Sequence, residues 1–172
     1  MPETCIRPAT AHDLPRLTEI YNYYVVHTPV TFDLESYTVE QRAPWFNQFA
    51  TTGRHRLLVA VENDLVLGYA GTTRFRAKAA YDTTVEATIY CAKEAVGKRL
   101  GQKLFAALFE SIAQEDIHRI VGGYTMPNVG SASLLERFQF QPVGIFRETG
   151  RKFGKYWDVA FLERPLHLPA GK

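Results

Sequence analysis

The chain has 172 residues, of which 46% are hydrophobic and 22% are charged, and its formal net charge at pH 7 is +2. These proportions are typical of a globular domain rather than a disordered segment, and a chain of this length can bury roughly 70% of its unfolded surface. The small net charge excludes the domain-wide basic stripe that general nucleic-acid binding requires. We therefore expect a single domain over residues 1–172 that does not bind nucleic acid.

Cysteine usage and hydropathy indicate where the protein resides. Cys5 and Cys91 are far apart and form neither a Cys-x-x-Cys pair nor a zinc-ligand pattern with histidine, so we expect no disulfide and no metal. The N-terminal stretch MPETCIRPAT has no apolar core and is not a signal peptide. The longest aliphatic run, LLVAV at 57–61, is far shorter than the ~20 residues that cross a bilayer. The sequence therefore predicts a cytoplasmic protein with no membrane partner.

The N-terminal part predicts a strand followed by two helices. Residues 4–8 predict a short strand, and Thr10 with Asp13 begins a helix with apolar residues at helical spacing. Thr38 with Gln41 forms a clearer capping box for a second helix. The aperiodic stretch HTPVTFDLES between the two helices predicts a surface loop.

The middle of the chain predicts a hairpin, a basic loop and a third strand. The β-rich runs 57–62 and 65–74 are separated by Asn-Asp, which favours a tight turn. RFRAKAAY at 74–81 is a basic loop, and TTVEATIYC at 83–91 alternates between two faces. One face carries Val85, Ala87, Ile89 and Cys91, and the other carries Thr84, Glu86, Thr88 and Tyr90.

The C-terminal half predicts two helices and three strands. Apolar residues at helical spacing from Leu100 predict a helix that ends near Asp116. A strand, a short helix and two further strands follow at 119–126, 128–138, 142–148 and 156–163. This order of elements, with no repeat or linker, indicates one mixed α/β layer fold.

The segment CAKEAVGKRLGQKL at 91–104 concentrates two glycines and four cations between a strand and a helix. A strand that runs through a glycine-containing turn into a helix leaves main-chain N–H groups unpaired. These groups, together with the positive end of the helix dipole, bind anions. By itself the pattern also describes an ordinary solvated turn. It lacks both the GK[ST] ending of a nucleotide P-loop and the GxGxxG dinucleotide fingerprint.

Other parts of the chain favour coenzyme A as the anion. The strand, basic turn and helix, followed by PNVGSASLLERFQF at 127–140, resemble the GNAT acyl-CoA N-acetyltransferase superfamily. More narrowly, the chain resembles the phosphinothricin and methionine-sulfone acetyltransferases. The stretches that carry this resemblance are, in order, IRPAT, DLPRLTEIYNYYV, AYDTTVEATIY and RETGRKFGKYWDVAFLERPL. The resemblance covers nearly the whole chain.

The resemblance implies a central mixed sheet, flanked by helices, whose fourth and fifth strands splay apart around acetyl-CoA. Acetyl-CoA would be a co-substrate, and no metal would take part. The main chain at Ile89, Tyr90 and Cys91 would bind the pantetheine and the acetyl carbonyl, and Asn128 would face the cofactor across the gap. The turn and helix residues that would hold the diphosphate are Gly97, Lys98, Arg99, Leu100, Gly101 and Gln102.

Three places depart from the family pattern, and one of them, Gln139 in place of the usual glycine before Phe140, is expected to affect only a helix C-cap. In the turn, Val96 and Arg99 replace the usual polar residue and the usual glycine, and Arg99 would either crowd the diphosphate or bond to it directly. Leu135 stands where a tyrosine or histidine usually donates or relays a proton. Tyr90 and Tyr124 are possible substitutes, although core packing is the preferred interpretation of Tyr124.

Glu86 is the predicted catalytic base. Acetyl transfer requires a neutral amine, and removing the proton from an ammonium at pH 7 costs on the order of 1 to 5 kcal/mol. A carboxylate in the cleft can take that proton directly or through one water. Glu86 matches the family's catalytic glutamate, and the alternative is an ordinary surface glutamate. Cys91 lies on the opposite strand face, which disfavours a covalent intermediate on its thiol.

The basic loop predicts an acceptor that carries an anionic group. Arg76, Lys78 and Tyr81 match the family's residues for the substrate anion, and Lys78 replaces an arginine that could bind a carboxylate with two hydrogen bonds. Phe32 and Tyr90 match the apolar walls of the acceptor site.

These features predict direct transfer of an acetyl group from acetyl-CoA to the amine of a small amino acid or analogue. The family resemblance also implies that the enzyme is a homodimer. The C-terminal GRKFGKYWDV either completes the acceptor pocket or contacts the second subunit, and Trp157 lies either in the core or against the ligand. A peptide or protein amine acetyltransferase is a first alternative, which the basic loop disfavours. A non-catalytic CoA-binding module is a second alternative. The apolar Leu135 and the altered turn suggest it, but the presence of Glu86 disfavours it.

Overall fold

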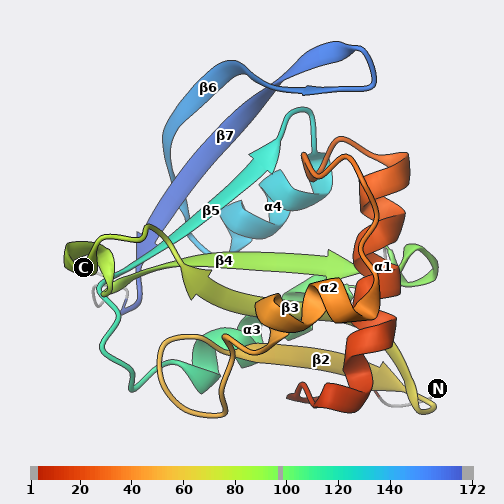
Figure 1. Ribbon diagram of the computed structural model, residues 1–172. Coiled ribbons are helices and arrows are strands. Elements are labelled where there is room, and N and C mark those ends of the chain that lie inside the picture. The colour runs from red at the N-terminus through yellow and green to blue at the C-terminus, as the bar shows by residue number, and fades with distance from the viewer. Residues whose placement is uncertain (1–3, 97–98, 168–172) are drawn as a thin grey trace.

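The computed structural model describes residues 4–96 and 99–167, and it contains a seven-stranded sheet with helices on both faces (Figure 1). The strands are β1 (Cys5–Pro8), β2 (Leu57–Glu62), β3 (Leu65–Arg74), β4 (Thr84–Cys91), β5 (Arg119–Thr125), β6 (Gln141–Lys152) and β7 (Lys155–Pro165). They lie in the order β1-β2-β3-β4-β5-β7-β6, and every neighbouring pair is antiparallel except β4 and β5. The predicted mixed α/β layer fold is confirmed.

The helices cover the sheet from both sides. They are α1 (Leu14–His27), α2 (Val39–Phe46), α3 (Leu100–Ser111) and α4 (Val129–Arg137), and the 3-10 turns are η1 (Ala11–Asp13), η2 (Ala79–Tyr81) and η3 (Lys93–Ala95). Successive residues of β4 show which helix covers which face. The ring of Tyr90 packs on Tyr21 of α1, with 5.1 Å between centroids, whereas Ile89 lies against Gly101 of α3. The helices α1 and α3 therefore lie on opposite faces.

Both predicted capping pairs form. The N–H of Gln41 donates to Thr38 Oγ1 at 3.2 Å, the N–H of Thr38 donates to Gln41 Oε1 at 2.8 Å, and α2 begins at the next residue. Asp13 accepts a hydrogen bond from the N–H of Thr10 at 2.7 Å, but this contact closes the turn η1, and α1 begins one residue later. Arg7 of β1 binds the same carboxylate with two hydrogen bonds, at 2.7 and 2.8 Å.

The third helix is shorter than predicted. It ends at Ser111 rather than near Asp116. The residues that would extend it, Glu115 and Asp116, instead form ion pairs with Arg56 and Arg54, which lie just before the start of β2. These partners are distant in sequence, so a helical pattern read locally could not show that the chain leaves the helix here.

The last two strands are longer than predicted. They join through a two-residue turn at Phe153 and Gly154, with φ of 53° and 74°, which is the conformation that a tight hairpin requires. Within β6 the register with β7 shifts between Phe146 and Gly150, where Glu148 has a φ of 52°. The resulting β6–β7 hairpin stands at one end of the molecule and reaches over the connection between α1 and α2 (Figure 1).

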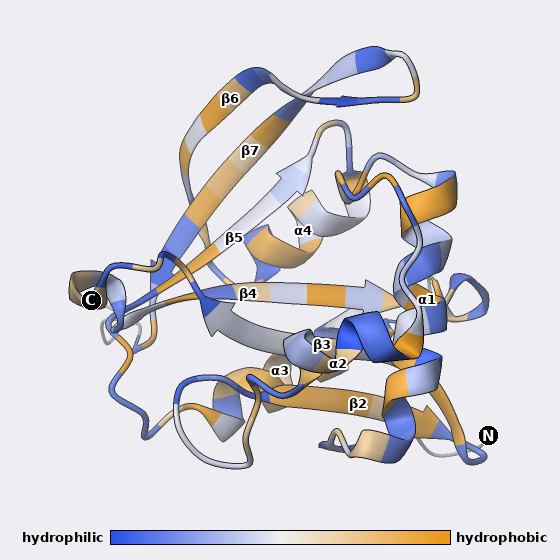
Figure 2. Cartoon of the chain, viewed as in Figure 1, coloured by the Kyte–Doolittle hydropathy of each residue, from blue (hydrophilic) through white to orange (hydrophobic). Residues whose placement is uncertain are grey.

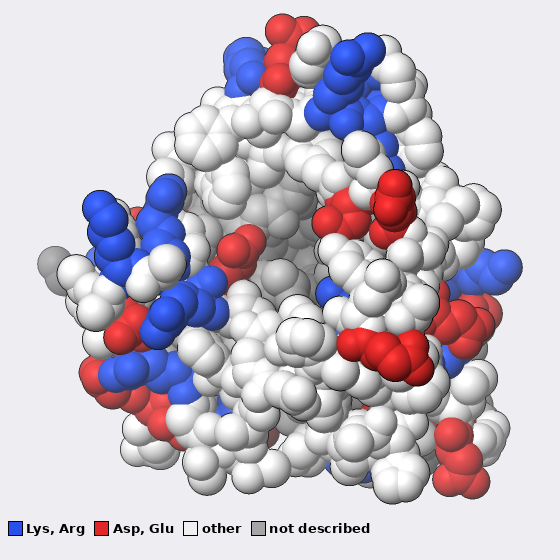
Figure 3. All heavy atoms as spheres, viewed as in Figure 1, with Lys and Arg blue, Asp and Glu red and all other residues white. Residues whose placement is uncertain are grey.

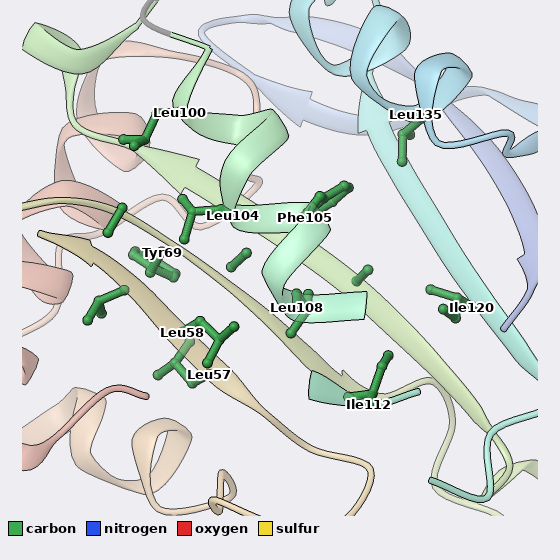
Figure 4. Close-up of a cluster of buried hydrophobic side chains, with 14 of the residues drawn as sticks. Leu57, Leu58, Tyr69, Leu100, Leu104, Phe105, Leu108, Ile112, Ile120 and Leu135 are labelled. Carbon is green, nitrogen blue, oxygen red and sulfur yellow. The ribbon is translucent and has the colours of Figure 1, made fainter. Parts of the chain in front are cut away.

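A hydrophobic core fills the space between α3 and the sheet (Figure 4). Leu104 and Leu108 of α3 are fully buried, as is Ile120 of β5. Strand β2 is apolar along most of its length because both of its faces are covered (Figure 2). Near α4, the ring of Phe138 packs edge-on against Phe105 of α3, with 5.6 Å between centroids.

The sheet opens between its two parallel strands. Pairing of β4 with β5 ends at Glu86 and Val121. Beyond this point β4 continues to Cys91 and β5 to Thr125, and the two strands diverge (Figure 1). This is the splayed geometry that the family resemblance implied.

Candidate active site

The gap between β4 and β5 exposes main-chain groups of β4. The N–H of Ala92 donates to the carbonyl of Leu67 in β3 at 2.8 Å, and alternate residues of an antiparallel strand face the same neighbour. The main chain of Tyr90 therefore faces β3, whereas the peptide groups of Ile89 and Cys91 face the gap. Since β5 has diverged at this level, the N–H groups of these two residues point into the gap rather than toward a paired strand.

Tyr24 of α1 reaches into the same gap. Its hydroxyl donates to the carbonyl of Cys91 at 2.5 Å, and burial raises the pKa of that hydroxyl to about 12. Nothing in the sequence indicated this contact, because a helical pattern does not show which tyrosine will reach a strand.

A cleft of about 700 Å³ occupies the gap, between β4 and α3 on one side and β5 and α4 on the other. This volume is within the range of small-molecule sites. The predicted cofactor residues that line the cleft are Ile89, Tyr90, Cys91, Arg99, Leu100, Gly101, Gln102 and Asn128. Gly97 and Lys98, predicted with them, lie outside the described residues.

Arg99 begins α3 in a left-handed conformation. Its φ of 57° and ψ of 18° place it in the region that favours glycine, which is the residue usual at this position in the family. The chain therefore keeps the backbone path of the turn despite the replacement. The side chain of Arg99 is exposed and lines the cleft. At the start of α3 the N–H of Gln102 donates to the carbonyl of Arg99 at 3.2 Å, so the N–H groups of Leu100 and Gly101 are those left without a partner in the helix.

The wall of the cleft formed by α4 is polar at its start and apolar at its centre. Asn128 caps α4 by accepting a hydrogen bond from the N–H of Ser131 at 3.0 Å. Leu135 is only 5% exposed and packs against Gly122 of β5 and Phe140. The position where the family usually has a proton donor is thus occupied by a packed aliphatic side chain.

Glu86 lies where β4 and β5 part. It is half-buried, and its carboxylate makes no hydrogen bond or ion pair with residues 4–96 or 99–167, so burial raises its pKa above the ordinary value. Its side chain shares a face of β4 with that of Tyr90, the face that α1 covers. A desolvated carboxylate with a raised pKa is suited to accept a proton closer to neutral pH.

Tyr90 belongs to an aromatic cluster beneath α1. Its ring lies 5.1 Å from that of Tyr21 and 5.4 Å from that of Tyr24, and burial raises its pKa to about 12. Arg42 of α2 is 7% exposed, with its guanidinium 4.0 Å from the ring of Tyr21 and 3.9 Å from that of Trp45. Sequence reasoning missed Arg42, because an arginine on a short helix is usually exposed.

The remaining candidates near the cleft have definite surroundings. Cys91 points to the face opposite Glu86, and burial raises the pKa of its thiol to about 11, so the thiol is not a reactive thiolate at neutral pH. Tyr124 packs against the core, as preferred from the sequence, and it also lines the cleft.

The residues predicted to bind the acceptor anion are not among those that line the cleft. Arg76, Lys78 and Tyr81 are exposed in the segment that joins β3 to β4. Thr73 of β3 pairs with Glu86, so this segment leaves the sheet close to the candidate base. Basic side chains gather over this segment, on one side of the hollow at the centre of the molecule, and acidic side chains lie across the hollow (Figure 3).

Phe32 lies in the connection between α1 and α2, where its ring rests on Gly150 of β6. It is not among the cleft-lining residues, but Val30 of the same connection is, so the connection borders the cleft. Trp157 is half-buried, and its Nε1 donates to the carbonyl of Lys152 at 3.0 Å, within the hairpin.

Two general features concern residues 4–96 and 99–167. This part of the chain has no group of three or more His, Cys, Asp or Glu side chains placed to hold a metal ion. It also has no helix that is long and apolar enough to cross a membrane.

Comparison with known proteins identifies the family. The family described as acetyltransferase (GNAT) domain matches residues 6–161. A phosphinothricin N-acetyltransferase of Streptomyces coelicolor is 49% identical over 166 residues, which cover 95% of this chain and 97% of that protein. An L-methionine sulfoximine/L-methionine sulfone acetyltransferase of Salmonella typhimurium is 30% identical over 161 residues, which cover 94% of each protein.

A solved structure agrees with these relatives. A GNAT superfamily phosphinothricin acetyltransferase of Sinorhizobium meliloti, in complex with acetyl-CoA, superimposes with a TM-score of 0.89 at 29% identity. The superposition covers 94% of this chain and 88% of that one. The chain therefore belongs to the GNAT acetyltransferase family and is an acetyl-CoA-dependent acetyltransferase, as its sequence predicted.

Proposed function

We propose that the chain transfers the acetyl group of acetyl-CoA directly to the amine of a small amino acid or analogue, with Glu86 as general base. The observation that carries this proposal is the place of Glu86, a desolvated carboxylate at the point where β4 and β5 part, beside a cleft of about 700 Å³. The relatives named for phosphinothricin and for methionine sulfone support an amino acid that bears an anionic or strongly polar group.

Acetyl-CoA would lie along β4. The outward-facing peptide groups of Ile89 and Cys91 would bind the pantetheine, and Tyr90 and Asn128 would contact it with their side chains. The first amides of α3 would bind the diphosphate, since a helix start offers unpaired donors and a positive dipole end. The residues assigned to this diphosphate site are Gly97, Lys98, Arg99, Leu100, Gly101 and Gln102.

Glu86 would take a proton from the acceptor ammonium, directly or through one water, because only the neutral amine can attack. The amine nitrogen then bonds to the acetyl carbon and gives up its second proton to water, the carbon–sulfur bond breaks, and the thiolate of coenzyme A leaves. The N–H of Ile89 faces the gap and would stabilise the negative charge that develops on the acetyl oxygen. With Leu135 apolar, the departing thiolate would receive its proton from water rather than from α4.

The acceptor would approach Glu86 from the basic segment between β3 and β4. Arg76 and Lys78 would bind its anionic group, with Tyr81 beside them, and Phe32 would contact its side chain together with Tyr90. Basic side chains gather on the side of the hollow from which the acceptor would approach, which supports a small anionic acceptor over a peptide (Figure 3).

Thiol release from acetyl-CoA tests the proposal. We expect the wild type to turn over phosphinothricin and methionine sulfone but not peptide amines. Glu86→Gln should lose most of this activity, and the matched surface variant Glu110→Gln should retain it. Turnover only on peptide amines would establish the first alternative. Saturable binding of coenzyme A without turnover of any amine would establish a non-catalytic module.

We also propose that the enzyme is a homodimer joined through β6. This strand lies at the edge of the sheet and contains hydrophobic residues (Figure 2). Three of their side chains are exposed, with Val143 62%, Ile145 43% and Phe146 59% exposed. An apolar edge strand favours association, and a two-fold axis would bring two copies of this surface together. Sedimentation should give the mass of two chains for the wild type and of one chain for Phe146→Asp, and a monomeric wild type contradicts the proposal.

The proposed location is the cytoplasm. Cys5 and Cys91 are both free, which is the state expected in a reducing compartment. Fractionation of cells that express the native chain should recover the acetyltransferase activity with cytosolic markers, and recovery in the extracellular or membrane fraction would contradict this.

A further inference from the structure

The connection between α1 and α2 is fastened to the β6–β7 hairpin at two consecutive residues. Lys152 of β6 donates from Nζ to the carbonyl of Thr31 at 2.8 Å, although the two residues are 121 positions apart. The ring of the next residue, Phe32, rests on Gly150 of the same strand. A long-range hydrogen bond and a close packing contact therefore act on neighbouring residues of one connection.

Gly150 is a glycine because the ring of Phe32 occupies the place of a side chain. A Cβ added to Gly150 would overlap Cε2 and Cζ of the ring, and even the third nearest ring atom, Cδ2, would be 2.6 Å away. The φ of Gly150 is not left-handed, so the ring rather than the backbone excludes other residues. At Gly144, in the same strand, an added Cβ would meet nothing within 4 Å.

Lys152 points inward from the hairpin. It is only 4% exposed, burial lowers the pKa of its ammonium, and the charge of Asp33 partly offsets that effect. Burying an ammonium costs free energy unless it is paired or hydrogen-bonded, so the carbonyl of Thr31 is an important partner for this side chain.

The same connection is tied to the strand that carries the proposed base. The hydroxyl of Tyr21 lies 2.7 Å from Oγ1 of Thr31, and its ring packs edge-on against Tyr90, with 5.1 Å between centroids. Tyr90 shares its face of β4 with Glu86. The connection that carries Phe32 therefore lies between the hairpin and the face of β4 from which the acceptor would be deprotonated.

We propose that Gly150 and Lys152 are positioning residues that set the size of the acceptor site by holding Phe32 in place. The proposal rests on the proposed function, in which Phe32 contacts the side chain of the acceptor. The hairpin then decides which acceptors fit, whereas the cleft beside β4 binds acetyl-CoA independently of it. Moving the ring of Phe32 by about 1 Å would change the fit of the acceptor and leave acetyl-CoA binding unaffected.

Replacing Gly150 or Gly144 with alanine tests whether the position of the Phe32 ring sets the fit of the acceptor. Gly150→Ala forces the ring of Phe32 away, and Gly144→Ala adds the same methyl group where there is room. From initial rates with both substrates varied, we expect Gly150→Ala to lower kcat/KM for the acceptor by about ten- to a hundredfold, with the KM for acetyl-CoA unchanged. The ranking of acceptors by side-chain length should also change. Gly144 lies in the proposed dimer surface, so sedimentation should first show that Gly144→Ala keeps the mass of the wild type. Its kcat and its KM for both substrates should then match those of the wild type.

A double-variant cycle shows whether Gly150 acts through Phe32. In a Phe32→Ala background an added methyl at position 150 has room, so Gly150→Ala should cause no further loss there. Lys152→Met removes the hydrogen bond to Thr31 and should raise the acceptor KM. Lys152→Arg retains a donor and should restore it in part. If Gly150→Ala fails to fold, the two Lys152 variants still test whether the hairpin positions Phe32.

Three results would each overturn the proposal: an acceptor KM that neither Gly150→Ala nor Lys152→Met changes, a loss that persists in the Phe32→Ala background, or an equal rise in KM for both substrates. A wild type that acetylates no small amino acid would instead contradict the proposed function. The two failures are therefore distinguishable in the same set of assays.

Discussion

The proposed active site has two ends, one proposed to bind acetyl-CoA and the other to bind the acceptor, and they are built in different ways. The acetyl-CoA end is formed by regular elements that are mostly consecutive in sequence, from the outward-facing peptide groups of β4 through the start of α3, with α4 opposite. The acceptor end is formed by irregular connections, at 28–38 and 75–83, and by the distant β6–β7 hairpin. Main-chain groups dominate the first end, and side chains dominate the second.

This difference determines how each end tolerates change. A site made of main-chain donors survives replacement of its side chains as long as the backbone path is kept, and Arg99, which occupies a glycine conformation, is an example. A site made of side chains on separate connections changes with each residue on any of them. Acetyl-CoA binding is therefore expected to be robust and acceptor choice easily altered, and the following predictions test this contrast.

The largest effect is expected at Glu86, where the two ends meet. Glu86→Gln should lower kcat by about 10²- to 10⁴-fold and leave the KM of both substrates close to that of the wild type. Burial raises the pKa of this carboxyl, and it acts as a base only above that pKa. The rate of the wild type should therefore rise with pH along a limb that lies above the ordinary glutamate pKa of about 4.3.

Steady-state rates from about pH 4 to about pH 9 measure this limb of the pH–rate profile. Glu86→Gln should lack it, but should keep any limb that arises from the titration of the acceptor amine. If the variant retains the lower limb and most of its activity, another group is the base.

A smaller effect is expected at the apolar wall of the acetyl-CoA end. Leu135→Tyr would place a family-like hydroxyl in the cleft, but the site is packed against Gly122, so we expect a loss of about 1–3 kcal/mol in the free energy of unfolding and no gain in kcat. Leu135→Met, which conserves volume, should cost less. Denaturant titration and rates measure both. A faster and equally stable Leu135→Tyr would show that the position can still donate a proton.

Arg99→Gly separates charge from backbone conformation in the turn. We expect the KM for acetyl-CoA to rise about fivefold, since the exposed guanidinium no longer attracts the diphosphate, and the acceptor KM to stay the same. Glycine removes left-handed strain, so the free energy of unfolding should rise by up to about 1 kcal/mol. Arg99→Ala should show the higher KM for acetyl-CoA without the gain in the free energy of unfolding. A lower KM for acetyl-CoA in Arg99→Gly would instead mean that the arginine crowds the diphosphate.

The smallest effect is expected at an ion pair beside the turn. Arg16 of α1 pairs with Glu94 of η3, and its Nε also donates to the carbonyl of Val66 at 3.1 Å. Without its partner, the carboxylate of Glu94 would repel the diphosphate that the start of α3 is proposed to bind. Arg16→Met should therefore raise the KM for acetyl-CoA about twofold, more at low salt, and adding Glu94→Gln should reverse the change. A rise that the second substitution does not reverse would assign the effect to lost packing instead.

Several parts of the fold could be predicted because their signals are local. The pair Thr38 and Gln41 marks the start of α2, and the alternation of β4 correctly placed Glu86 and Cys91 on opposite faces. The end of α3 was predicted wrongly because Glu115, which would extend the helix, binds an arginine 59 residues away.

The sequence by itself determined the family, the order of elements and the stretch of β4 and α3 that borders the cleft, since periodicity and turn chemistry are properties of short segments. Only the tertiary structure decided that Tyr24 reaches the carbonyl of Cys91, that Leu135 is packed, and that Phe32 rests on Gly150. These contacts join segments that are distant in the sequence, as does the hydrogen bond between Lys152 and Thr31, which are 121 residues apart. Such contacts depend on how all the elements pack at once. No short stretch of the chain contains that information.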